Sequence, residues 1–410
     1  MNFLNYQRAI RLRSFFLTLY RHKRLSQQIN MDLIDRLKTL SAHMELEPAE
    51  DAGCPAGLKM DHEPFLSQAA LPNGRKITML KTLLTSACER NCYYCPFRAG
   101  RDFRRATFKP EELVKTFISL HQAGITQGIF LSSGIIRGGL HTQDQLIDTA
   151  AILREKYSFQ GYIHLKIMPG AERDQVERSM RLADRVSINL EAPNTHRLQL
   201  LAPGKQFLDE LVEPLRWVNE IRTRQPGQLG WKGRWPSSVT QFVVGAVGES
   251  DAELLATTDM LHHQLGLQRV YYSAFRPHLD TPLEDRPPES LQRQSRLYQA
   301  FFLLRDYGFD LQELPLDNHG NLPRQADPKL SWAQNHLAHT PLEINQVDRQ
   351  QLLRIPGIGP KGTRVILSAR RQSRISNLED LKKLGINTNR CAPFILINGK
   401  RPMYQPALFA

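Results

Sequence analysis

The chain has 410 residues, of which 41% are hydrophobic and 23% are charged, and it contains no long apolar run. This composition excludes a disordered, collagen-like or membrane-spanning protein. At roughly 100–200 residues per domain, the length predicts two or three units. The formal net charge is +13, and it is concentrated at the ends. Residues 1–30 hold six basic residues and no acid, and residues 341–410 hold twelve basic and four acidic residues. Basic terminal segments predict a polyanionic partner, such as nucleic acid.

The first 76 residues precede the regular alternation of predicted strands and helices. Residues 1–30 are interpreted as a basic tail or extension, because a short apolar stretch is followed by further basic residues without a cleavage site. A good helical pattern follows Met31, so translation beginning there is an alternative that would make residues 1–30 non-native. Residues 31–76 are predicted to be a helical lead-in. With few cysteines and no membrane segment, a cytoplasmic location is expected.

From residue 77 onward, short apolar runs alternate with helical patterns. Six strands separated by helices are typical of repeated βαβ units, and therefore of an α/β fold with a parallel sheet or barrel. Residues 77–275 are too few for a full eight-stranded barrel, so we expect a partial, six-stranded one. The barrel segment is placed at 77–315 and a linker at 316–340. The predicted strands are 77–85, 128–132, 161–167, 185–190, 239–244 and 268–273.

Three of the five cysteines lie within eight positions, at Cys88, Cys92 and Cys95. Thiolates with this spacing on one loop can hold three corners of an iron–sulfur cube, which leaves the fourth iron open for another ligand. The alternative is a structural zinc site completed by a fourth ligand such as Cys54. The position of the loop favours the cluster, because loops that follow strands carry the site in βα folds.

Residues 341–400 are predicted to form a small all-α unit, followed by a tail at 401–410. A short helix meets a turn with Gly357 and Gly359, and a second helix follows with Lys361 and Arg364. This stretch resembles a helix-hairpin-helix motif. The glycines and the first amides of the second helix would hold a phosphate oxygen, and the two basic residues would add charge. Such a motif contacts the nucleic-acid backbone and does not read bases. The alternative is that the hairpins only mediate protein contacts.

The cysteine motif, with Tyr94 before its last cysteine, resembles the signature of the radical S-adenosylmethionine (SAM) superfamily. The resemblance implies a partial (βα)6 TIM-like barrel, a [4Fe-4S] cluster and S-adenosyl-L-methionine bound at the open iron. It also implies an external electron donor. One electron would cleave the sulfonium and give a 5′-deoxyadenosyl radical that abstracts hydrogen from the substrate.

The resemblance also assigns residues to the cofactor. The turn after the second predicted strand, at the usual place of a Gly-Gly-Glu motif, here offers hydroxyls in place of a carboxylate. Two residues after the fourth strand lie where ribose contacts are common, and a glycine after the fifth strand lies where adenine packs. Lys166 is placed in the barrel lumen as a contact to SAM or substrate. The implied cofactor-binding residues are Tyr94, Ser132, Ser133, Gly134, Lys166, Asn189, Glu191 and Gly245.

Further elements, among them Cys95-Pro-Phe-Arg98 and Leu201-Ala-Pro-Gly-Lys205, resemble radical SAM proteins described as DNA modification or repair proteins. Their genes often lie near one for a uracil-DNA-glycosylase-like partner. The resemblance implies a DNA-acting enzyme and no membrane partner. The preference for DNA over RNA rests on family usage. An RNA-modifying enzyme, a non-enzymatic redox-sensing DNA-binding protein, and an enzyme with a protein or small-molecule substrate remain alternatives. Four arginines after the cluster loop are candidates for steering a phosphate: Arg98, Arg101, Arg104 and Arg105.

Overall fold

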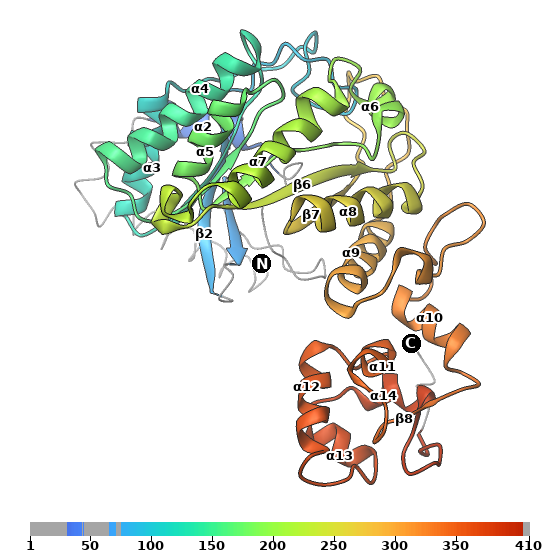
Figure 1. The fold of residues 1–410 in the computed structure, drawn as a ribbon. Coiled ribbons are helices and arrows are strands. Elements are labelled where there is room, and N and C mark those ends of the chain that lie inside the picture. Colours follow the sequence, from blue (N-terminus) through green and yellow to red (C-terminus); the bar gives the residue numbers. More distant parts are fainter. Residues whose placement is uncertain (1–30, 43, 45–64, 71–74, 405–410) are drawn as a thin grey trace, which may run out of the picture. The chain divides into compact units, whose positions relative to one another are not determined.

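The computed structural model describes residues 31–42, 44, 65–70 and 75–404 (Figure 1). Residues 1–30 and Cys54, to which the sequence assigned a tail and a possible ligand, lie outside these ranges. The chain divides into two compact units, Met1–Val247 with Leu265–Pro288 and Gly248–Gln264 with Glu289–Ala410. In the described ranges, no helix is long and apolar enough to cross a bilayer.

The first unit is built on a seven-stranded sheet whose strands follow one another in chain order. The edge strand β1 pairs antiparallel with β2, and every later pair is parallel. The expected six parallel strands of a partial barrel are therefore confirmed. The strands are β1 (Leu66–Ala70), β2 (Lys76–Leu83), β3 (Gly128–Ser132), β4 (Tyr162–Lys166), β5 (Arg185–Ser187), β6 (Ser237–Val244) and β7 (Arg269–Ala274).

β1 corrects the prediction that residues 31–76 contain only helix. Its sequence, Leu-Ser-Gln-Ala-Ala, has no β-branched or aromatic residue, so its local preference for a strand is weak. Pairing with β2 from Leu66↔Leu80 to Ala70↔Lys76 makes it a strand in spite of this. The predicted lead-in helix is present as α2 (Met31–Ser41).

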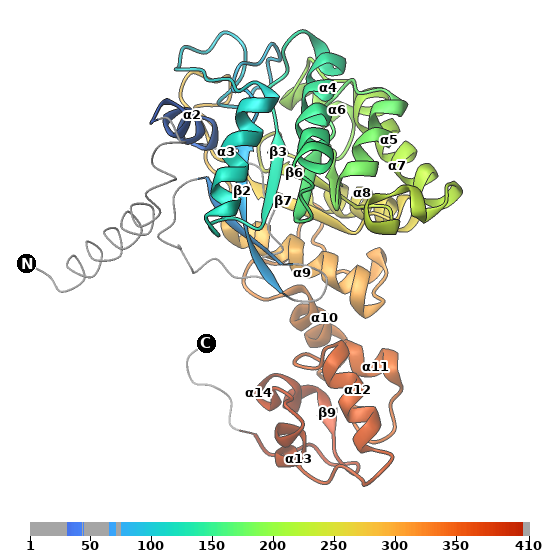
Figure 2. The same cartoon turned by 90° about the vertical axis from the view of Figure 1, so that its left-hand side faces the viewer.

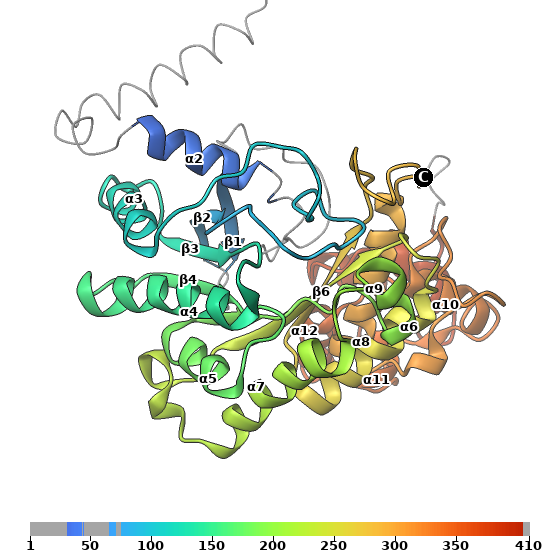
Figure 3. The same ribbon diagram turned by 90° about the horizontal axis from the view of Figure 1, so that it is seen from above.

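Helices connect the parallel strands and cover one face of the sheet, as Figures 2 and 3 show for α3, α4, α5 and α7. Residues that point to these helices, such as Ile129, Leu131 and Leu165, are fully buried. The opposite, concave face carries Phe130 and polar side chains such as His164. Because parallel strands bring their carboxyl ends to one edge, the loops that follow them meet there. The helices are α3 (Pro110–Gln122), α4 (Gly138–Ala151), η2 (Ile152–Lys156), α5 (Arg173–Leu182), α6 (Thr195–Leu201), η3 (Phe207–Val212), α7 (Glu213–Arg224), η4 (Gly227–Leu229) and η5 (Trp231–Gly233).

The second unit begins with two long helices and continues into short ones. Its elements are α8 (Asp251–Leu265, whose last residue belongs to the first unit), α9 (Leu291–Tyr307), η6 (Leu311–Glu313), α10 (Pro328–His336), β8 (Leu342–Glu343), α11 (Arg349–Arg354), α12 (Pro360–Ala369), α13 (Leu378–Lys383), α14 (Thr388–Cys391), η7 (Ala392–Phe394) and β9 (Ile395–Leu396). The structure thus places α9, which the sequence assigned to the barrel segment, in the second unit. It also forms α10 within residues expected to be a linker.

The expectation that residues 341–400 are all-α is wrong in one respect. β8 and β9 form a small parallel sheet with the register Leu342↔Ile395 and Glu343↔Leu396. The strands are only two residues long, and they lie more than 50 residues apart in the sequence. No local sequence pattern therefore predicts them. Their pairing joins the beginning and the end of this helical segment.

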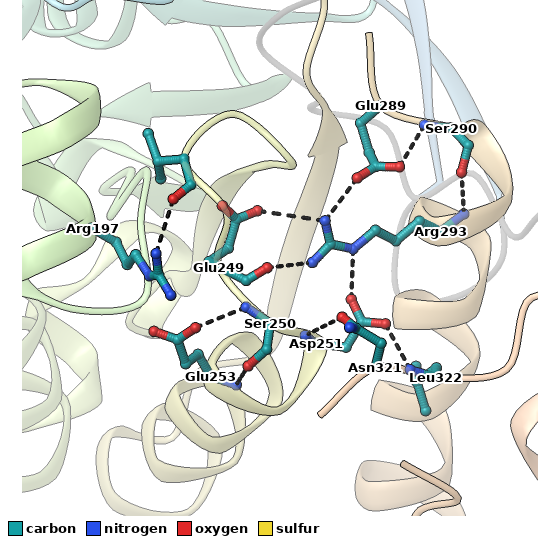
Figure 4. Close-up of polar contacts among 11 residues, drawn as sticks. Arg197, Glu249, Ser250, Asp251, Glu253, Glu289, Ser290, Arg293, Asn321 and Leu322 are labelled. Carbon is teal, nitrogen blue, oxygen red and sulfur yellow. Dashed lines mark hydrogen bonds and ion pairs between the residues drawn. The ribbon is translucent and has the colours of Figure 1, made fainter. Parts of the chain in front are cut away.

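A buried arginine joins the two chain segments of the second unit (Figure 4). Arg293 Nε lies 2.7 Å from Asp251 Oδ1, and its Nη1 lies 2.7 Å from Glu289 Oε2. Asp251 Oδ2 also accepts a hydrogen bond from the Leu322 amide at 2.9 Å. Asp251 and Arg293 are almost completely buried, so each offsets the desolvation cost of the other. These contacts tie residues 248–264 to residues 289–322.

The helices from α10 onward enclose a separate apolar core that includes Ile355, Ile358 and Cys391. Cys391 is fully buried, and burial raises the pKa of its thiol to about 12. It therefore behaves as a small core residue, as the sequence indicated.

Candidate functional site

The loop between β2 and α3 carries the three cysteines along the wall of a pocket at the carboxyl edge of the sheet. The pocket has an empty volume of about 780 Å³, part of it open to solvent. It is lined by Leu83, Cys88, Arg90, Cys92, Tyr94, Cys95, Phe97, Ser133, Gly134, Ile135, Lys166, Met168, Pro169, Asn189, Glu191, Lys205 and Gln241.

The three thiols lie close enough to act on one another electrostatically. Burial, and then the charge of Cys92, raise the pKa of Cys95. Burial likewise raises the pKa of Cys92, to which Cys88 contributes, while Lys205 opposes the rise. In the described part of the chain, no three His, Cys, Asp or Glu side chains converge on a point where one metal ion would bind. A cubane cluster requires a different arrangement of thiolates, since each thiolate binds a different iron.

The turn after β3 supports the beginning of the cysteine loop. The Gly134 amide donates to the Thr85 carbonyl at 2.7 Å, and the Ile135 amide donates to Cys88 Sγ at 3.4 Å. A Cβ atom at position 134 would lie 2.2 Å from the Ala87 carbonyl oxygen, so only glycine allows this approach. The Ser-Ser-Gly turn therefore contributes backbone to the cysteine loop, and its amide at Ile135 would stabilise a thiolate.

A second segment, residues 201–210, supports the other end of the loop. The Tyr93 amide donates to the Leu201 carbonyl at 2.8 Å. Arg90 donates to the Gly204 carbonyl and forms an ion pair with Glu210, with 2.6 Å between Nη2 and Oε1. These contacts fix the loop between the turn after β3 and the segment that joins α6 to η3.

Two of the arginines considered for phosphate steering are bonded to the backbone of this region instead. Arg105 donates to the carbonyls of Ser86 at 2.8 Å and Arg98 at 2.9 Å. Arg101 donates to the carbonyls of Pro96 and Leu279. Of the four, Arg104 is exposed. The contacts of Arg101 and Arg105 therefore indicate that these residues hold the loop together. They do not indicate that they steer a phosphate.

Lys205 and Glu191 form an ion pair inside the pocket, with 3.0 Å between Nζ and Oε1. Burial alone would raise the pKa of Glu191, but the attraction of Lys205 and Lys166 lowers it. Burial alone would lower the pKa of Lys205, but Cys92 and Glu191 raise it. Glu191 has a φ of 65°, a left-handed conformation that costs energy for a residue with a side chain. Its carboxylate is thereby turned into the pocket.

The structure brings together most of the residues that the sequence assigned to the cofactor. Tyr94, Ser133, Gly134, Lys166, Asn189 and Glu191 line the pocket. Asn189 donates from Nδ2 to Gln241 Oε1 at 3.2 Å. Ser132 and Gly245 are not among the lining residues; Ser132 is buried at the end of β3, and Gly245 has a φ of 91° directly after β6.

Sequence reasoning did not single out Lys205, Arg90 or Gln241 as site residues. The sequence did contain a signal for Lys205, because this residue ends the stretch Leu201-Ala-Pro-Gly-Lys205, which is part of the family resemblance. Its carboxylate partner lies 14 residues earlier in the chain, and only the fold shows that they meet.

The pocket's residues fit an iron–sulfur cluster with a polar organic ligand. Three thiols face a space that also holds two buried charges, and the Ser133 hydroxyl, 8% exposed, has no hydrogen-bond partner. Such a buried hydroxyl is costly unless a ligand binds it. Cys88, Cys92 and Cys95 would hold the cluster, and the polar side chains opposite them would contact the ligand.

A comparison with protein families supports this assignment. Residues 82–261 match the family model described as the radical SAM superfamily. These residues form a radical SAM domain. Members of this family use a [4Fe-4S] cluster and SAM. A search of curated proteins finds no match to the chain.

Solved structures of low sequence identity resemble the chain in part. They include methylornithine synthase (PylB), with 15% identity over 55% of this chain and 61% of that one at a TM-score of 0.43. The [FeFe]-hydrogenase maturase HydG from Carboxydothermus hydrogenoformans has 19% identity over 55% and 51% at a TM-score of 0.41. The cobalamin-dependent radical SAM enzyme OxsB has 12% identity over 74% and 51% at a TM-score of 0.32. The chain thus spans about half to three fifths of the structures it matches.

The second unit carries the predicted hairpin outside the radical SAM domain. Gly357 has a φ of 82°, and a Cβ there would lie 2.7 Å from the Asn387 carbonyl oxygen. Gly359 is the N-cap of α12, and Lys361 and Arg364 on that helix are exposed. Beneath the turn, Lys329 Nζ donates to the Ile358 carbonyl at 2.6 Å. The turn is therefore tightly packed and presents two basic side chains to solvent.

Proposed function

We propose that the chain is a radical SAM enzyme that acts on nucleic acid, in DNA modification or repair, and that the second unit binds the nucleic-acid backbone. The observation that carries the proposal is the glycine turn between α11 and α12, with Lys361 and Arg364 exposed beside the first turn of α12. Helix N-termini next to basic side chains favour phosphate. We interpret this arrangement as a helix-hairpin-helix motif.

The charge of the C-terminal segment supports the same proposal. Residues 341–410 carry twelve basic and four acidic residues. Among the described ones, Arg349, Arg371, Arg374, Lys382, Lys383 and Lys400 are exposed. A concentration of exposed basic residues on one small unit is the electrostatic pattern expected of a nucleic-acid-binding domain. Contacts of this kind bind the backbone without reading sequence, so they do not discriminate DNA from RNA.

The bound cofactors supply a carbon-centred radical that abstracts hydrogen. The chain's own residues prepare the pocket for this chemistry. The Ile135 amide and the charge of Lys205 stabilise the thiolates, and Glu191 and Asn189 offer acceptors to a hydroxylated ligand. Because a reacting base is inaccessible inside a duplex, the target nucleotide would be extruded into the pocket. An electron donor and a uracil-DNA-glycosylase-like protein are the partners we propose.

The test is the stimulation of SAM cleavage by polymers. The cluster is reconstituted anaerobically and reduced, and 5′-deoxyadenosine is quantified with duplex DNA, single-stranded DNA, bulk RNA or no polymer. Stimulation by DNA would support the proposal, and stimulation by RNA alone would favour an RNA-modifying enzyme. Formation that is indifferent to all three polymers would overturn the nucleic-acid proposal and leave the radical SAM assignment intact.

A further inference from the structure

A buried lysine supports the hairpin turn from inside the second unit. Lys329, on α10, is 8% exposed. Its Nζ donates to the Ile358 carbonyl at 2.6 Å and lies 4.6 Å from the centre of the Tyr307 ring. Lysine is rarely buried to this extent. Because a charge inside the core costs stability, a functional reason for keeping an amine at this place is expected.

The charged groups that face Lys329 are engaged with one another. Asp327 caps α10 with one carboxylate oxygen and forms an ion pair with Arg390 through the other. Arg354 is paired with Glu313, with 2.8 Å between Nη2 and Oε2. Asp327 attracts the amine of Lys329, whereas Arg390 and Arg354 repel it. The two arginines therefore offset the attraction of the carboxylate.

The amine of Lys329 is consequently close to losing its proton at neutral pH. Burial, which Asp327 opposes only in part, lowers the pKa of Lys329 to about 7. Burial raises the pKa of the neighbouring Tyr307, so this phenol stays neutral in the range where the lysine titrates. An anion brought to the turn would favour the charged form of the lysine and raise its pKa again.

The hydrogen bond to Ile358 connects this amine with the donors of the turn. The Ile358 carbonyl and the Gly359 N–H belong to one peptide group, and a trans peptide directs them to opposite sides. An ammonium that donates to the carbonyl polarises the group and makes its N–H a stronger donor. Gly359 is the N-cap of α12, and the first amides of a helix have no acceptor within it. A charged Lys329 thus strengthens the donors at which the proposed function places a phosphate.

We propose that Lys329 is a proton-dependent positioning residue of the hairpin, and that a phosphate at the turn and a proton at Lys329 stabilise each other's binding. The inference rests on the proposed function, because it requires the turn to bind the backbone of a nucleic acid. Lys329 does not touch the phosphate, and it acts through the peptide group between Ile358 and Gly359 and through its charge. By linkage, binding takes up a proton, and affinity falls as pH rises above about 7.

The test measures proton uptake when the full chain, with its cluster reconstituted, binds a short DNA duplex at fixed salt. Calorimetry at about pH 7.5 in two buffers of different ionisation enthalpy gives the uptake, and the dissociation constant is measured from about pH 6 to 9. If the phosphate raises the lysine pKa by about one unit, binding takes up about half a proton and weakens about eightfold over this range.

Two variants separate the charge of Lys329 from the other charges of the unit. Lys329→Met removes the amine and keeps a chain of similar length, so the proton uptake and the pH dependence should both disappear. Lys361→Gln is the matched comparison, because its amine is exposed on α12. This variant should bind more weakly by the same factor at every pH and should keep the full proton uptake.

The outcomes distinguish this inference from the nucleic-acid proposal. Duplex binding without pH dependence, or proton uptake that persists in Lys329→Met, would overturn the inference and leave the nucleic-acid proposal intact. Absence of binding to both duplex DNA and bulk RNA would reject the two together. If Lys329→Met does not fold, Lys329→Arg decides the question. A guanidinium keeps its charge over the whole range, so this variant should bind the duplex without the pH dependence.

Discussion

Lys205 Nζ and Glu191 Oε1 lie 3.0 Å apart, and both side chains are almost completely buried beside the cysteine loop. Each charge lowers the cost of burying the other, and neither would be tolerated alone. The pair thereby fixes the segment around residue 205 next to the cysteines, where Lys205 also attracts Cys92.

The first prediction concerns this pair. Lys205→Met leaves Glu191 buried without its partner, and Glu191→Gln does the same to Lys205, so each should destabilise the first unit by about 3–5 kcal/mol. The double variant should regain most of this loss. Urea unfolding of the three variants measures it as a double-mutant cycle. Additive losses in the double variant would mean that the two residues act independently.

The second prediction tests the cluster ligands. Cys92→Ala should abolish iron binding and 5′-deoxyadenosine formation, because a cubane held by two thiolates loses a corner. Iron content and visible absorption after anaerobic reconstitution measure the effect. Cys391→Ala is the control, since this thiol lies in the core of the second unit. Iron bound equally well by Cys92→Ala and the unmodified protein would refute the ligand assignment.

The third prediction concerns the hairpin. Lys361→Gln and Arg364→Gln should each weaken duplex binding and reduce the slope of log affinity against log salt by about one, because each removes one phosphate contact. The matched control is Lys382→Gln, a residue that is exposed on α13 and whose Nζ already lies 3.7 Å from Glu379 Oε1. A salt slope that falls equally in all three variants would show that binding follows net charge and not this turn.

Gly357 gives a complementary test of the turn itself. Gly357→Val should destabilise the second unit, because φ is 82° and a Cβ would lie 2.7 Å from the Asn387 carbonyl oxygen. Circular dichroism of thermal unfolding measures the loss. Gly385→Ala is a milder control: φ there is 77°, but a Cβ would meet nothing within 4 Å. An unaffected Gly357→Val variant would mean that the turn is not as tightly packed as described.

The sequence predicted the parts of the fold that have local signals. Residues 128–132 were predicted as a strand and form β3 with the same bounds, because an apolar run that is buried on both faces ends at turn residues on each side. The strand predicted at 185–190 is shorter, since β5 ends at Ser187, and Glu191 then pairs with Phe242 of β6 only as an isolated bridge. β1, β8 and β9 depend on partners elsewhere in the chain, and their own sequences do not indicate strands.

The sequence likewise predicted only the part of the site that has a local signal. Cysteine spacing and loop position indicated Cys88, Cys92 and Cys95 as ligands of one centre. The neighbours that shape it, such as the Ile135 amide after β3 and Lys205 between α6 and η3, are brought in by the fold from distant parts of the chain. The sequence also predicted a common face for His164 and Lys166, because side chains alternate along a strand. The contributions of Lys81 and Arg185 to this face required the register of the sheet.

The last prediction concerns pH and His164. Because burial, and then the charges of Arg185, Lys166 and Lys81, keep the folded-state pKa of His164 well below 6.5, the unfolded chain binds a proton that the folded protein does not. Stability should therefore fall as pH decreases below about 6.5, by up to about 1.4 kcal/mol per pH unit from this residue. His164→Gln should remove that contribution between pH 6.5 and 5. Urea unfolding of both proteins across this range measures the difference, with His263→Gln on the exposed face of α8 as control. Parallel pH profiles for the protein and its His164→Gln variant would mean that the imidazole is protonated in the folded protein.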